Sequence, residues 1–142
     1  MGFLNALTGG GATIQLQLQK DRFQAGEAVF AWVTVIANDN LNTEGVVLHI
    51  MATEHTHGGH CQRCNTTVGD RSEAIYNNEI LIAGPQQMMR GEQRQFQGSI
   101  QIPMGIPPTY QGRNASNRWF IEARVKMFGN DPDTRREIIV FG

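Results

Sequence analysis

The sequence contains few cysteines, little charge and no long apolar run, and each shortage limits what the protein can be. The two cysteines are not needed as staples, because 142 residues are enough to bury a core. Charged residues make up 18% of the chain, and 12 Lys and Arg against 13 Asp and Glu give a net charge of −1. This balance gives no electrostatic reason to expect nucleic acid or an anionic membrane as a partner. No run approaches the ~20 apolar residues of a transmembrane helix, so we expect no integral membrane segment.

We expect no targeting signal in the segment from Met1 to Gly11. A secretory signal needs a basic start and a longer apolar core than Phe3 to Leu7 provides. We therefore expect a cytoplasmic protein. Phe3 to Leu7 is predicted to form one short helical turn that docks on the domain, and the three glycines that follow are predicted to be a flexible lead-in.

The spacing of apolar residues predicts β-strands along the rest of the chain. In the segment 13–19 apolar residues alternate strictly with glutamines, which is the period of a half-buried strand. Residues 28–36 are almost all apolar and predict a strand covered on much of both faces. We therefore expect Phe30, Trp32 and, in a later strand, Trp119 to be enclosed. Further strands are predicted at 46–54, 75–82, 92–102, 118–128 and 135–141.

Seven strands, separated by Gly, Asn, Asp and Pro and with no helical stretch of useful length, predict an all-β fold. The expected architecture is a two-sheet antiparallel β-sandwich, immunoglobulin-like, in a single domain over residues 1–142. Pro103, Pro107 and Pro108 fix the backbone and remove three hydrogen-bond donors, so this segment is predicted to be a rigid crossover between the sheets. Tyr110, just after it, is expected to cover the end of the core.

Two stretches resemble a known family. Residues 20–35 read KDRFQAGEAVFAWVTV and look like the start of arrestin-like N-terminal domains; residues 102–112 read IPMGIPPTYQG and are similar to a proline-rich segment of the same family. With the opening Met-Gly-Phe-Leu, the sequence most resembles the bacterial sporulation-control type of arrestin-like protein. The resemblance implies an arrestin-like sandwich that binds other proteins. The family usually joins two such sandwiches, and this sequence matches the first.

A cluster of histidines and cysteines is the one segment with metal-ligand character, and the resemblance does not account for it. Two thiols at C-x-x-C spacing can share one metal, and nearby imidazoles can complete a tetrahedral shell for Zn²⁺. The surrounding segment, 55–72, is rich in glycine and polar residues and is predicted to be a loop that a structural zinc ion orders. The favoured ligands are His55, His57, Cys61 and Cys64, with His60 as the substitute.

Three other interpretations of this cluster stay open. Cys61 and Cys64 can form a disulfide, which a reducing compartment disfavours. The segment can also be a solvated loop whose histidines and cysteines have no common role. A catalytic zinc ion would need an open coordination position and a general base, and Glu54 is the only acid beside the cluster.

The sequence therefore favours a non-enzymatic protein–protein interaction module, an adaptor or scaffold that presents sheet edges and end loops to protein partners. The identity of the partner is not encoded in any motif. Two alternatives belong to other classes. A self-assembling structural subunit, a homo-oligomer, is suggested by glutamine-rich strand faces that carry little opposing charge. A zinc-dependent hydrolase would use the His/Cys segment.

Overall fold

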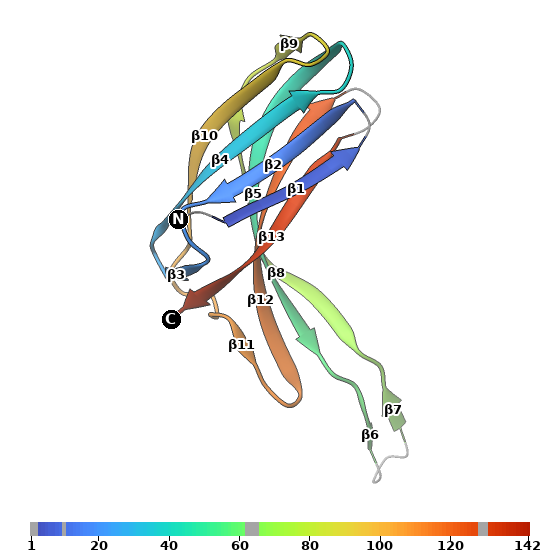
Figure 1. Cartoon of the computed structure of the whole chain (residues 1–142). Helices are drawn as coiled ribbons and strands as arrows, with labels where there is room; N and C mark the ends of the chain where they lie inside the picture. Colours follow the sequence, from blue (N-terminus) through green and yellow to red (C-terminus); the bar gives the residue numbers. More distant parts are fainter. Residues whose placement is uncertain (1–2, 10, 62–65, 128–130) are drawn as a thin grey trace.

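Every element of the chain is a β-strand in the computed structural model, which describes residues 3–9, 11–61, 66–127 and 131–142. The strands form two main sheets that pack face to face, with a long ribbon projecting from one end (Figure 1). The predicted all-β antiparallel sandwich is confirmed. Among the described residues, no helix has the length and apolar character needed to cross a membrane.

The smaller sheet has four antiparallel strands and includes the start of the chain. The expected helical turn at Phe3 to Leu7 is wrong, because this segment pairs along its whole length with the strand that follows. Gly9 pairs with Ala12, so Gly9 is part of a strand instead of the free lead-in that was expected. The strand order is β1 (Phe3–Gly9), β2 (Ala12–Leu18), β4 (Ala28–Ala37) and β10 (Gln93–Gln101).

The larger sheet has seven strands and carries the ribbon. Its central pair is long and antiparallel, and its one parallel pair lies at the edge. All the strands that the sequence predicts are present in the two sheets. The order is β3 (Arg22–Gln24), β13 (Asp133–Phe141), β12 (Ala115–Met127), β5 (Leu41–Thr56) and β8 (Arg71–Ala83), with β9 (Gln86–Met88) paired to β5 and β11 (Tyr110–Gln111) paired to β12.

The core fills the space between the two sheets, where the inward residues of each strand meet. Trp119 is fully buried, as expected, and is the largest buried side chain. The expectation for Phe30 and Trp32 is wrong, because β4 is covered by the opposite sheet on one face only. Phe30 is 43% exposed and Trp32 is partly exposed, while the alternate residues of β4 are buried. An apolar run does not reveal which face of a strand is covered.

The prolines of the crossover fix one end of the core. The segment from Ile102 to Thr109 connects the two sheets, as predicted. The carbonyl oxygen of Pro107 accepts hydrogen bonds from Trp119 Nε1 at 3.0 Å and from Asn117 Nδ2 at 2.7 Å. Tyr110 does not cover the core, because it lies in β11 and is 38% exposed. Instead, the buried Trp119 indole and Asn117 amide, both hydrogen-bonded to the crossover, lie at this end of the core.

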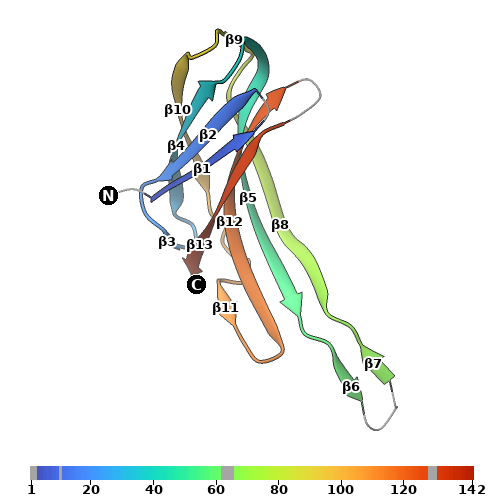
Figure 2. The ribbon, with the colours of Figure 1, turned by 45° about the vertical axis from the view of Figure 1, so that its right-hand side comes forward.

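Strands β5 and β8 continue beyond the sandwich as a two-stranded ribbon (Figures 1 and 2). Thr56 pairs with Arg71 at the end of the sheet, and the same register continues in β6 (Gly59–Cys61) and β7 (Thr66–Val68). In the described part of the segment 55–72, residues 55–56, 59–61, 66–68 and 71–72 are therefore paired strand and not the loop that the composition predicts, while 57–58 and 69–70 connect the paired stretches. Ladder hydrogen bonds between the two strands hold these paired stretches.

Candidate functional site

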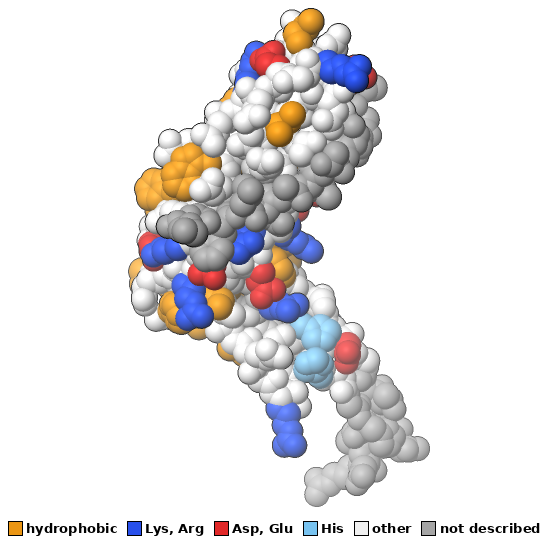
Figure 3. Space-filling model, viewed as in Figure 1, with side chains coloured by type: hydrophobic (Ala, Val, Ile, Leu, Met, Phe, Trp, Pro, Cys, Tyr) orange, Lys and Arg blue, Asp and Glu red, His pale blue; other side chains and the backbone are white. Residues whose placement is uncertain are grey.

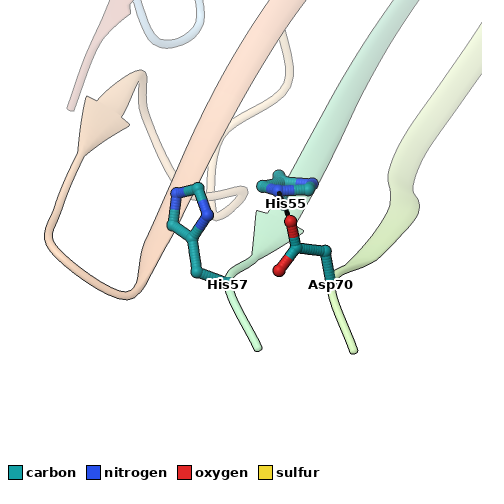
Figure 4. Close-up of side chains that lie close together, drawn as sticks. All are labelled: His55, His57 and Asp70. Atoms are coloured by element: carbon teal, nitrogen blue, oxygen red, sulfur yellow. Dashed lines mark ion pairs between the residues drawn. The ribbon is translucent and has the colours of Figure 1, made fainter. Parts of the chain in front are cut away.

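Three ligand-type side chains meet where the ribbon leaves the sandwich (Figure 4). They are His55, His57 and Asp70, and one ligand atom of each lies within 4.8 Å of the others. The rings of His55 and His57 are perpendicular, with centroids 4.7 Å apart. Oδ2 of Asp70 lies 3.7 Å from Nε2 of His55. The cluster is open to solvent, since His57 and Asp70 are exposed and His55 is partly exposed.

The ribbon register brings these residues together. His55 is the penultimate residue of β5, and in extended chain a residue two positions further points to the same side. The expectation that His55 and His57 share one side is therefore met by their ring contact. Asp70 immediately precedes β8, and the pairing on either side of it puts it across the ribbon from His57.

Two hydrogen bonds orient the cluster. Nδ1 of His55 lies 2.8 Å from the hydroxyl oxygen of Ser72, on the opposite strand. The backbone N–H of Gly58 donates to Oδ1 of Asp70 at 2.7 Å. This bond, together with the two histidines, holds the pKa of the Asp70 carboxyl below its usual value. The carboxylate is thus held as an anion with Oδ2 turned toward the imidazole.

The structure brings together only part of the predicted ligand set. Cys61 lies in β6, further along the ribbon, and its side chain and that of His60 are not among the described ones. Cys64 lies outside the described residues. Zinc binding by these cysteines stays a prediction. Sequence reasoning missed Asp70, which only the hairpin register could have placed opposite His57.

Ser72, His55 and Asp70 are the residue types of a nucleophilic triad, but they are not arranged as one. A triad needs a carboxylate hydrogen-bonded to the ring nitrogen that faces away from the serine. Here the separation between Asp70 Oδ2 and His55 Nε2 is 3.7 Å, longer than a hydrogen bond. All three side chains also lie at an open surface. The zinc-dependent hydrolase stays a prediction of the sequence, and this trio adds no independent support for enzymatic activity.

A groove of about 600 Å³ runs beside the histidines on the outer face of the larger sheet. Figure 3 shows histidine side chains, in pale blue, at the base of the ribbon with basic and acidic groups nearby. Phe120 and Tyr110 give the groove aromatic surface, and Arg118, Arg135 and Glu137 give it charge. The Arg135 guanidinium lies 4.7 Å from the centre of the Phe120 ring. Arg118 pairs with Glu137 at 3.4 Å, and both are exposed enough for water to weaken the pair.

The two facing sheets, the proline crossover and the antiparallel order define an arrestin-like β-sandwich. The family model described as SpoOM protein matches residues 1–132, so the chain belongs to the Spo0M family. The crystal structure of Spo0M, a sporulation control protein from Bacillus subtilis, is similar in fold, with a TM-score of 0.69 and 18% identity over 94% of this chain. That match covers 50% of the Bacillus protein, so this chain spans about half of its length. No curated protein matches the sequence.

Proposed function

We propose that this chain is a non-catalytic interaction module, an adaptor or scaffold that binds a protein partner in the groove at the base of the ribbon. Membership of the Spo0M family fits a regulatory or interaction role, and the similar Bacillus protein is described as a sporulation control protein. The observation that carries the proposal is the groove itself. It is the place where the outer sheet face, the ribbon and the β11 edge meet.

The chemistry of the groove supports a peptide or protein ligand. Arg and Tyr are enriched among the residues that dominate binding energy at protein interfaces, and both types line this groove. Its aromatic surface is accompanied by cations and an anion, so a partner with apolar and acidic side chains is complementary to it. The exposed Arg118–Glu137 pair contributes at most about 1 kcal/mol to stability, so its ions can re-pair with a ligand at little cost.

The proposal is tested by comparing what the wild-type chain and a charge-reversed groove variant capture from the native lysate. Arg118→Glu reverses a charge in the groove, and Arg90→Glu makes the same change at an exposed position near β9, at the other end of the sandwich (Figure 1). We expect the wild type and Arg90→Glu to retain the same partner and Arg118→Glu to lose it by at least tenfold. Equal capture by all three proteins would contradict the groove as the binding surface.

A second candidate function is self-association through the outer face of the smaller sheet, and one observation favours it. On β4 this face carries Phe30, Trp32 and Ile36, and glutamines flank that column on both sides. Gln17 pairs across from Trp32 on one side and Gln97 on the other. The outward positions of β2, β4 and β10 include no charged residue. Amides donate and accept hydrogen bonds, so a two-fold-related copy is complementary to this face.

The size of this face predicts weak association. Four strands about 4.8 Å apart and roughly seven residues long present roughly 450 Å². Two such faces bury roughly 900 Å², below the usual range for stable interfaces, so we expect dissociation in the micromolar to millimolar range. Sedimentation at rising concentration tests this, with Phe30→Lys as the variant and Phe141→Lys, an equally exposed position in the other sheet, as the control. A monomer at about 1 mM, or a Phe30→Lys protein that still associates, rejects this second function.

A further inference from the structure

We propose that His55, His57 and Asp70 form a binding site for one divalent transition-metal ion, Zn²⁺ in the first instance, without either cysteine. The sequence pattern favours a site completed by Cys61 and Cys64. The geometry at the base of the ribbon points to a carboxylate from the returning strand in their place. This inference does not depend on the interaction role proposed above.

The separations suit a shared ion. Two ligand atoms bound tetrahedrally to one zinc ion, each about 2.05 Å from it, lie about 3.4 Å from each other. His55 Nε2 and Asp70 Oδ2 are 3.7 Å apart, too far for a hydrogen bond and close to that separation. One nitrogen of His57 falls within the same 4.8 Å group. His57 and Asp70 are exposed, so small side-chain rotations close the remaining gap without moving the backbone.

The hydrogen bonds around the cluster are those that prepare ligands for a metal. Ser72 Oγ can accept the proton of His55 Nδ1, which leaves Nε2 unprotonated and facing Asp70. The N–H of Gly58 holds the second oxygen of Asp70, which leaves Oδ2 available. A histidine ligand and a carboxylate ligand are thus each oriented by a partner outside the site. Such outer partners are typical of metal sites.

The ligand types select the ion. Imidazole nitrogens favour zinc and its first-row neighbours over Ca²⁺ and Mg²⁺, which prefer all-oxygen shells. Three protein ligands leave a fourth position for water. Because His55 and Asp70 come from the two opposite strands of the ribbon, the ion would join those strands where they leave the sheet. In extended geometry the backbone of Cys61 would lie about 13 Å along the chain from that of His57.

The test is zinc titration of the reduced, metal-free chain in competition with a chromophoric chelator. The variants are Asp70→Asn and His57→Ala, and the double variant Cys61→Ser/Cys64→Ser removes both thiols. Glu73→Gln is the matched control, because it neutralises another exposed carboxylate of the same returning chain segment, three residues after Asp70 and on the opposite face of the ribbon. Substitution with Co²⁺ adds a spectroscopic readout, since thiolate ligands give an intense near-ultraviolet band and nitrogen and oxygen ligands do not.

We expect the wild type to bind one Zn²⁺ per chain and Asp70→Asn and His57→Ala to bind it at least tenfold more weakly. Glu73→Gln and the double cysteine variant should stay within about threefold of the wild type, and the Co²⁺ form should lack the thiolate band. Loss of binding in the cysteine variant, retention in Asp70→Asn, or no stoichiometric binding by the wild type would each overturn the proposal. Far-ultraviolet circular dichroism checks that every variant has folded, and the exposed positions of His57, Asp70 and Glu73 favour this.

Discussion

Truncation of Trp119 to alanine tests the account of the core most severely. The indole is fully buried, and a buried tryptophan removes about 150–250 Å² from water. At about 25 cal/mol per Å² this area corresponds to about 4–6 kcal/mol. Alanine retains part of the contact, so we expect the free energy of unfolding to fall by about 3–5 kcal/mol. Loss of the indole N–H does not leave the Pro107 carbonyl oxygen without a hydrogen bond, because Asn117 Nδ2 still donates to it.

The matched control is Trp32→Ala, which removes the same side chain from a partly exposed position on β4. Its cost should be about 1 kcal/mol or less, since truncation there opens no enclosed cavity. Urea unfolding followed by circular dichroism measures both; with a slope of about 2 kcal/mol per M, the midpoint of Trp119→Ala should fall by about 2 M. A loss below about 1.5 kcal/mol at Trp119, or equal losses at the two positions, would refute this description of the core.

Two further predictions concern other parts of the fold. A Cβ on Gly98 of β10 would lie 2.4 Å from Cγ2 of Ile82, so Gly98→Ala should cost about 1–3 kcal/mol in urea unfolding and Ile82→Ala should rescue part of it. If the contact is real, the stability lost in the double variant should be smaller than the sum of the losses in the two single variants. The Gln24 N–H, with Lys20, holds the pKa of Glu27 below its usual value, so Lys20→Met should raise that pKa in an NMR titration without restoring it fully. The stability that Glu27 contributes should be present above its unfolded pKa and lost as pH falls through the lower folded pKa; a Glu27 pKa at its ordinary value in the wild type contradicts the contact.

Strand periodicity predicts most of this fold, and the misses have physical reasons. The segment Phe3–Gly9 has apolar residues at a spacing that also suits a helical turn, and it becomes a strand because β2 offers an edge with which it pairs along its whole length. Phe30 and Trp32 are apolar without being enclosed, because coverage depends on the opposite sheet. Local sequence does not contain that information.

The candidate site was only half predictable for a related reason. His55 and His57 are visible as a pair two residues apart, which places them on one side of any strand. Asp70 is far from them in the sequence and joins them only through the ribbon register. The groove combines residues from separate strands, so its assembly also requires the tertiary fold. The composition of the segment 55–72 is typical of a loop, yet its described part includes the paired strands of a ribbon. Ladder hydrogen bonds can form such strands without apolar side chains.

The most direct test of the central claim is amide hydrogen exchange of the chain alone and with its captured partner. If the groove binds the partner, exchange should slow at residues 109–120 and 135–137, which include β11, the first half of β12 and the part of β13 that lines the groove. The backbone amides of the smaller sheet should exchange at the same rate in both samples. Protection confined to residues 28–36 and 93–101, with the groove unchanged, would contradict the proposed binding surface.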